Sequence, residues 1–168
     1  HLRQRRRRRH AMGERVRREH VGGMGGELIR EATTADLDRC VAMGVRFLTE
    51  TCYRGRIAEN PAQMRETAAQ LIDSPVGALF VAEQGAGLVG MIGVLAYTHP
   101  LSGQSIAAEL FWWVEPERRG CGVRLLRKAE DWARTQGAAA LQMIAPTPDV
   151  AQLYDRLGFT AVETLYQR

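Results

Sequence analysis

The sequence predicts an α+β domain of three layers, in which helices flank a mixed and largely antiparallel β-sheet. Three observations support this fold class. Segments whose apolar residues recur at helical spacing alternate with segments of strand composition. Three strand segments follow one another with only short connections, which is typical of antiparallel pairing. The 168 residues suffice for one domain with a sizeable core.

The first part of the predicted domain contains one strand and two helices. We expect a short strand at 27–31 and then a helix over about 35–50, in which residues such as Leu37 and Val41 share one apolar face. A second helix begins at Pro61, because proline fits the first helical position. These elements precede the main strands of the sheet.

The middle of the chain has the composition of successive strands. Residues 77–83 and 88–98 are largely apolar and have the composition of strands, and the turn at 84–87 between them predicts a hairpin. A loop with proline and glycine at 99–104 leads into a third strand at 106–114. We therefore expect three adjacent antiparallel strands.

The last part of the chain returns to alternating elements. The pattern predicts a helix at 122–135, a buried strand at 138–144 and a short helix at 148–157. Gly158 ends that helix, and residues 159–166 are expected to close the sheet as a final strand. The predicted order is β-α-α-β-β-β-α-β-α-β.

Charge is distributed unevenly along the chain. Residues 1–24 contain nine arginines and two glutamates and carry +7, which leaves −3 for the rest of a chain of net charge +4. A run such as Arg5–Arg9 repels itself, so we expect residues 1–26 to form a disordered tail and residues 27–168 to form the domain. The tail is either a nucleic-acid-binding arm or non-native sequence upstream of a start at Met24 or Met12.

Composition excludes several classes of protein. The apolar content of 45% and charged content of 25% are ordinary for a globular domain. No apolar run approaches the roughly 20 residues that span a bilayer, so we expect no membrane partner. The spacing of Cys40, Cys52 and Cys121 is unlike that of metal ligands. A reduced, cytoplasmic setting and no metal are the simplest expectations.

The strongest local feature joins the strand at 106–114 to the following helix. Gly120 and Gly122 let backbone N–H groups approach a ligand closely, and the start of a helix attracts anions. Five basic residues add positive charge nearby: Arg118, Arg119, Arg124, Arg127 and Lys128. This combination fits a pyrophosphate. A tight turn with a solvated basic face is the alternative, since Leu125 replaces the third Rossmann glycine and no P-loop Lys-Ser/Thr follows.

A second feature lies in the last predicted helix. Val150, Leu153, Tyr154 and Leu157 share one of its faces, and Phe159 follows Gly158 in the next turn. An isolated tyrosine of this kind is usually a core residue whose hydroxyl is hydrogen-bonded.

Together, these two features resemble the GNAT superfamily of N-acetyltransferases, from about Leu28 to the C-terminus. The superfamily's pyrophosphate motif, Gln/Arg-x-x-Gly-x-Gly/Ala, is similar to Arg119-Gly120-Cys121-Gly122-Val123-Arg124, although Arg124 departs from the small residue. The family's late tyrosine resembles that of Tyr154-Asp155-Arg156-Leu157-Gly158-Phe159, and Thr147 stands where an asparagine often opens the helix. The order of elements also matches.

The resemblance implies an enzyme that transfers acetyl from acetyl-CoA, its cosubstrate, to a primary amine by direct attack in a ternary complex. It implies that the stretch from Arg119 to Arg124 binds the pyrophosphate. The backbone of Trp112, Trp113 and Val114 would pair with pantetheine and polarise the thioester carbonyl. Tyr154 would protonate the departing thiolate.

Glu109 is the candidate general base, because an alkylammonium of pKa ~10 must lose a proton before it attacks. Some family members use a glutamate on this strand. In a regular strand, however, Glu109 shares a face with Phe111 and Trp113, whereas Trp112 and Val114 share the other, unless a bulge intervenes. A surface or network carboxylate is the alternative role for Glu109.

The acceptor is not specified beyond a small-molecule amine or a peptide or protein amine. By resemblance, residues 47–56 and 97–104 contact it. The alternatives to the enzyme are a non-catalytic acyl-CoA-binding domain and a nucleic-acid-associated protein that acts through its tail. The charge of −3 outside the tail argues against nucleic acid. The sequence leaves open whether the protein forms a homodimer.

Overall fold

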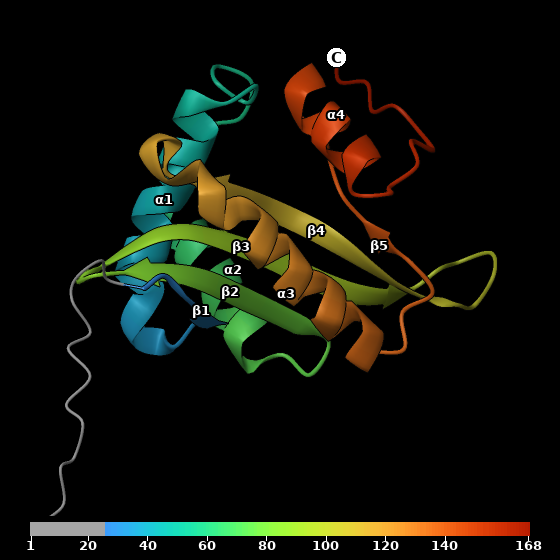
Figure 1. Ribbon diagram of the computed structural model, residues 1–168, viewed down its shortest axis with the longest axis horizontal. Helices are drawn as coiled ribbons and strands as arrows, with labels where there is room; N and C mark the ends of the chain where they lie inside the picture. The colour runs from blue at the N-terminus through green and yellow to red at the C-terminus, as the bar shows by residue number, and fades with distance from the viewer. Residues whose placement is uncertain (1–25) are drawn as a thin grey trace, which may run out of the picture.

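The structure, a computed structural model, describes residues 26–168 (Figure 1). The predicted tail at 1–26 lies outside these residues except for Gly26, so its disorder stays a prediction. No helix within 26–168 has the length and apolar character needed to cross a bilayer.

A single five-stranded sheet forms the centre of the domain, with its strands in chain order. The strands are β1 (Leu28–Glu31), β2 (Gly77–Gln84), β3 (Gly87–Thr98), β4 (Ser105–Val114) and β5 (Leu141–Gln142). The first four pair antiparallel and β5 pairs parallel to β4. The prediction of a mixed, largely antiparallel sheet is therefore confirmed.

Helices cover both faces of this sheet (Figure 1). The short 3₁₀ turn η1 (Thr34–Asp36) leads into α1 (Leu37–Glu50), and α2 (Pro61–Asp73) follows. After β4, η2 (Pro116–Cys121) leads into α3 (Gly122–Thr135), and α4 (Pro148–Arg156) follows β5. The helices α1 and α2 pack on one face, while α3 packs on the other.

The alternating side chains of the central strands build two separate cores. In β2, Leu79 and Val81 join the cluster under α1 and α2, which also contains Met43 and Trp113. Phe80, between them, joins the cluster under α3 with residues such as Ile92 and Leu125. Since both faces of β2 are buried, its sequence is continuously apolar rather than alternating.

The last predicted strand, at 159–166, is wrong. The chain beyond α4 has no strand, and Val162, Leu165 and Tyr166 are highly exposed. The predicted strand at 138–144 is also reduced, to Leu141–Gln142. The second departure accounts for the first: because β5 pairs with β4 over only two residues, it offers no extended edge against which residues 159–166 could pair.

Candidate active site

The sheet opens between β4 and β5. The strand β5 pairs only with Ala107 and Ala108, and from Glu109 to Val114 the same edge of β4 has no strand partner within residues 26–168. Figure 1 shows β5 meeting β4 near one end, with α4 lying beyond. Unpaired backbone N–H and C=O groups along an edge can pair with an extended ligand.

A β-bulge in β4 decides the direction of Glu109. Phe111 lies opposite Gly93 and Glu109 lies opposite Val94, so Leu110 is an extra residue in β4. Since Val94 belongs to the core under α3, the side chain of Glu109 faces α3. A regular strand would group Glu109 with Phe111 and Trp113, but the bulge, an exception that the sequence left open, places Glu109 on the face of Trp112.

Gly93 makes room for this arrangement. A Cβ atom at Gly93 would lie only 2.4 Å from Cζ of Phe111. The ring of Phe111 thus lies directly over the backbone of β3, next to the bulge. A side chain at position 93 would displace that ring.

Glu109 is buried and only 9% exposed. Its Oε2 accepts a hydrogen bond of 3.0 Å from the backbone N–H of Ile144. Burial raises the pKa of Glu109 to about 7, although that hydrogen bond favours the charged form. A carboxyl group with such a pKa can gain and lose a proton near neutral pH, as a general base must.

Tyr154 lies beside the same peptide. Its hydroxyl donates a hydrogen bond of 3.1 Å to the backbone carbonyl of Ile144. The ring stacks on Trp112 at 6.1 Å between centroids and contacts Phe159 at 5.3 Å. Burial, and to a lesser degree the charge of Glu109, raises the pKa of Tyr154 well above its usual value, so its hydroxyl is protonated at neutral pH. The structure therefore brings the two predicted catalytic residues together.

Ile144 was not predicted from the sequence in any role, because an apolar side chain gives no sign of what its backbone binds. Thr147, three residues later, caps α4: its hydroxyl accepts a hydrogen bond from the backbone N–H of Val150 at 3.3 Å. This cap fixes the start of the helix that carries Tyr154.

The glycine turn leads from η2 into α3 as predicted. Gly120 is exposed, and a Cβ atom there would meet no other atom within 4 Å. Gly122 is different, because a Cβ atom there would lie 3.1 Å from Cζ2 of Trp112. Gly120 thus leaves open space at the start of α3, whereas Gly122 permits close packing against β4.

The other residues of this turn differ in their surroundings and contacts. Cys121 is buried, and this raises the pKa of its thiol to about 11, which is unfavourable for a nucleophile. Arg119 lies in η2, and Val123 is in the first turn of α3. Arg124 binds the segment before β1: its Nη1 donates to Oε1 of Glu27 at 2.9 Å and its Nη2 to the Glu27 carbonyl at 3.1 Å. No local pattern in the sequence predicts this role for Glu27.

The end of β4 places its two tryptophans on opposite faces. Trp112 faces α3, and its buried Nε1 has no hydrogen-bond partner among the described residues. Trp113 faces α1, and the Arg46 guanidinium lies 5.4 Å from its ring centroid. Val114 ends the strand between the two helical layers and packs in the core under α3.

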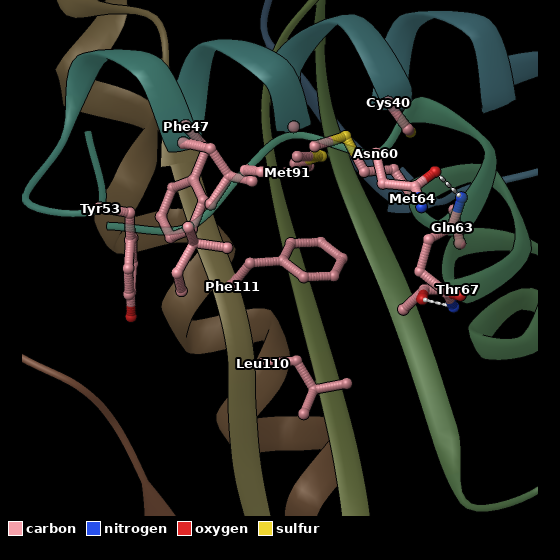
Figure 2. A pocket seen from close by; sticks show the side chains of 15 residues that line it. Cys40, Phe47, Tyr53, Asn60, Gln63, Met64, Thr67, Met91, Leu110 and Phe111 are labelled. Atoms are coloured by element: carbon pink, nitrogen blue, oxygen red, sulfur yellow. Dashed lines mark hydrogen bonds between the residues drawn. The ribbon is translucent and has the colours of Figure 1, made fainter. Parts of the chain in front are cut away.

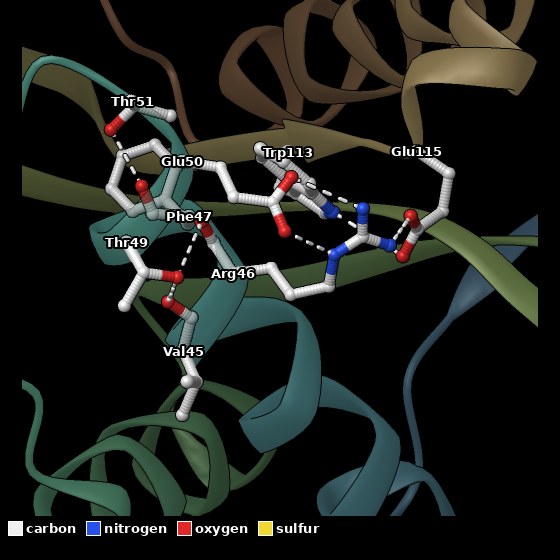
Figure 3. Close-up of polar contacts among 8 residues, drawn as sticks. All are labelled: Val45, Arg46, Phe47, Thr49, Glu50, Thr51, Trp113 and Glu115. Atoms are coloured by element: carbon white, nitrogen blue, oxygen red, sulfur yellow. Dashed lines mark hydrogen bonds and ion pairs between the residues drawn. The ribbon is translucent and has the colours of Figure 1, made fainter. Parts of the chain in front are cut away.

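Arg46 ties α1 to the segment just after β4 (Figure 3). It pairs with Glu50 on its own helix and with Glu115, one residue beyond the end of β4. Glu115 also accepts from Nε1 of Trp113 at 3.5 Å. This network was not predicted from the sequence, since it joins residues 69 positions apart.

A pocket of about 370 Å³ lies on the opposite face of β4 (Figure 2). It is formed by α1, the connection to α2, α2 itself, β3 and the bulge. Phe47, Leu48 and Tyr53 belong to the stretch 47–56 that was expected to contact the acceptor, whereas residues 97–104 do not line this pocket. Its lining comprises Cys40, Gly44, Phe47, Leu48, Tyr53, Ile57, Ala58, Asn60, Gln63, Met64, Thr67, Ala68, Met91, Leu110 and Phe111.

The open edge of β4 fits the binding of an acyl-CoA molecule. The edge offers unpaired peptide groups, and the space at Gly120 adjoins the N-terminal end of α3. No group of three or more His, Cys, Asp or Glu side chains within 26–168 is arranged to hold a metal ion.

Known proteins share this architecture. A sequence model described as the acetyltransferase (GNAT) family matches residues 43–159. A transcriptional regulator from Bacillus halodurans C-125 is 26% identical, with a TM-score of 0.72 over 85% of this chain and 99% of its own. No curated protein matches in sequence.

Two further structures share the fold at lower identity. An aminoglycoside N-acetyltransferase, AAC(6')-Iy, in complex with CoA is 13% identical, with a TM-score of 0.73 over 88% of this chain and 97% of its own. A ribosomal-protein-alanine N-acetyltransferase from Brucella melitensis biovar Abortus 2308 is 16% identical, with a TM-score of 0.66 over 84% and 97%. Since the family model spans more than half of the chain, this protein belongs to the acetyltransferase (GNAT) family.

Proposed function

We propose that this protein transfers the acetyl group of acetyl-CoA to a primary amine, which attacks directly in a ternary complex. One observation carries the proposal. Glu109 and Tyr154, one poised to accept a proton and one protonated, meet at Ile144 beside the open edge of β4. Acetyl-CoA supplies the activated acetyl thioester, and the protein's own residues supply the binding groups, the general base and the general acid.

The edge of β4 from Glu109 to Val114 would hold the pantetheine arm by backbone pairing. The strand has no partner there, and its other edge is fixed by β3. A backbone N–H in the stretch of Trp112, Trp113 and Val114 would polarise the thioester carbonyl.

The turn from Arg119 to Arg124 would bind the pyrophosphate. Gly122 is the position where a Cβ atom would crowd Trp112, so it requires the smallest residue. Arg124, which stands where the family usually has a small residue, has room for a long side chain that binds Glu27.

Glu109 would act as the general base. Its carboxylate accepts one proton of the ammonium group and passes it to solvent, which leaves the nitrogen lone pair free to form the new N–C bond. With a pKa of about 7, roughly half of the Glu109 side chains are ionised at neutral pH. The hydrogen bond from Ile144 holds the carboxylate in place.

Tyr154 would act as the general acid. As the C–S bond breaks, the hydroxyl turns from the Ile144 carbonyl and gives its proton to sulfur. The second proton of the attacking nitrogen then replaces it, so one proton moves from nitrogen to sulfur overall. The high pKa of Tyr154 makes it a weak acid, but the same buried surroundings also disfavour a free thiolate.

The direct test is amine-dependent release of CoA. The purified protein, acetyl-CoA and a panel of primary amines and peptide N-termini are incubated, and free thiol and acetylated amine are quantified by mass spectrometry. The proposal predicts equal amounts of both products. Binding of acetyl-CoA with no acetylated product from any amine would instead support a non-catalytic acyl-CoA-binding domain.

A further inference from the structure

The pocket in Figure 2 reaches the bulge of β4. Leu110, the bulged residue, lines it, whereas the side chain of the preceding residue, Glu109, faces α3 on the other side of the sheet. Only β4 separates the two sides here, and its edge from Glu109 to Val114 has no strand partner within residues 26–168. An amine whose body lies in the pocket would reach Glu109 with its nitrogen by passing this open edge.

The lining of the pocket contains no charged residue: none of its 15 side chains is Asp, Glu, Lys, Arg or His. Two hydrogen bonds join polar groups of the lining. The side chain of Asn60 accepts from the backbone N–H of Gln63 at 3.1 Å, and Gln63 donates to Thr67 at 3.4 Å. A second ammonium group inside this pocket would find no counter-ion, and burying an unpaired charge is costly.

The remaining lining suits an apolar group. The ring centroids of Phe47 and Tyr53 lie 5.2 Å apart, and the ring of Phe111 lies over Gly93. Met64 and Met91 contribute flexible, polarisable thioethers that adapt to the shape of a ligand. The volume of about 370 Å³ is near the lower end of the range for small-molecule sites.

We infer that this pocket holds the uncharged body of the acceptor, and that the substrate class is a monoamine with one compact aromatic or branched aliphatic group. This inference rests on the proposed transfer to an amine and narrows the acceptor to one class of amine. Polyamines and other polycations are excluded as good acceptors, because the lining of the pocket offers no carboxylate to a second ammonium group.

The methionines allow a test that does not depend on turnover. The full chain is labelled with methyl-¹³C methionine and titrated with 2-phenylethylamine, and separately with spermidine. We expect saturable shifts of the Met64 and Met91 methyl signals with 2-phenylethylamine only. Met143, which packs on the α3 side of the sheet, serves as the internal control. Equal or larger shifts of the two pocket signals with spermidine, or no shift with either amine, would overturn the inference.

A variant connects these shifts to the pocket. Met64→Gln keeps the length of the side chain but puts an amide against the ligand, so the affinity for 2-phenylethylamine should fall about tenfold, equivalent to ~1.4 kcal/mol. The melting temperature and the affinity for acetyl-CoA should stay close to those of the unaltered protein, since Met64 is only partly buried and lies on α2, away from the glycine turn. Unchanged affinity for 2-phenylethylamine would contradict the assignment.

Turnover separates this inference from the proposed function. If spermidine is acetylated with a higher kcat/KM than 2-phenylethylamine, the transferase stands and the substrate class is wrong. If 2-phenylethylamine binds at Met64 and Met91 but no amine is acetylated, the transfer reaction fails while the ligand class of the pocket stands.

Discussion

Glu109 and Tyr154 are joined through one residue: Glu109 accepts from the N–H of Ile144, and Tyr154 donates to its carbonyl. The two side chains come from β4 and α4, which are separated along the chain by α3 and β5. β5 ends at Gln142, so the chain has already left β4 where the peptide groups of Ile144 position both side chains. The site and the gap that admits a ligand thus have the same structural origin.

Replacing Glu109 by Gln should stabilise the fold at high pH. The folded pKa of about 7 exceeds the ordinary value of 4.5, so the carboxyl binds its proton more tightly in the folded state, and stability falls as pH rises between these values. Glutamine does not titrate. Its advantage should grow from pH 5 to pH 8, up to about 3 kcal/mol, as followed by the melting temperature at both values.

The control for this prediction is Glu66→Gln, on the exposed side of α2. It should leave the pH dependence of the melting temperature as it is in the unaltered protein. A Glu109→Gln variant whose melting temperature tracks that of the unaltered protein at both pH values would show that this carboxyl is not held with a raised pKa.

Replacing Tyr154 by Phe should lower kcat by about 10²–10⁴-fold, because the proton donor is lost. The ring can still stack on Trp112 and contact Phe159. The missing hydrogen bond to Ile144 should lower stability by only about 1 kcal/mol. Steady-state kinetics beside thermal melting checks this. A variant that turns over at the full rate would leave Tyr154 with a structural role only.

The two glycines of the turn should respond differently to substitution. Gly120→Glu adds a carboxylate in open space at the start of α3, so it should keep the melting temperature and weaken acetyl-CoA binding. Gly122→Ala should instead lower the melting temperature, because its Cβ would press on Trp112. Calorimetric titration with acetyl-CoA distinguishes the two. If Gly120→Glu binds with unaltered affinity, the turn is not the phosphate site.

Replacing Arg46 by Ala should destabilise the end of β4 by about 1 kcal/mol, through the lost contact with Trp113 and the lost pair with Glu115. Arg65→Ala is the matched control, because Arg65 makes one exposed ion pair, with Asp38. Chemical unfolding of both variants checks the difference. Equal and small losses for the two would mean that Arg46 contributes no more than a surface charge.

The sequence was sufficient for the layers of the fold, because the strands 77–83 and 88–98 and the glycine turn carry strong local signals, whereas the roles of the site residues stay a prediction. It could not specify the direction of Glu109. A bulge depends on how Gly93 and Phe111 meet across two strands, and no local pattern in β4 shows it.

The prediction of a strand at 159–166 was wrong because strand formation also depends on a partner elsewhere in the chain. Residues 159–166 have the composition of a strand, but a strand needs an edge to pair with, and β5 is too short to give one. The contacts of Arg124 with Glu27 and of Arg46 with Glu115 were missed because each joins distant parts of the chain. Such contacts depend on tertiary structure rather than on local preference.

The pH dependence of kcat tests the central claim, that Glu109 is the base of an acetyl transfer. With 2-phenylethylamine and saturating acetyl-CoA, kcat of the unaltered protein should rise with pH through an apparent pKa near 7, as the carboxylate forms. Glu109→Gln should be slower by about 10²-fold or more and should lack this step. A Glu109→Gln variant that keeps both the rate and the step near pH 7 would contradict the account.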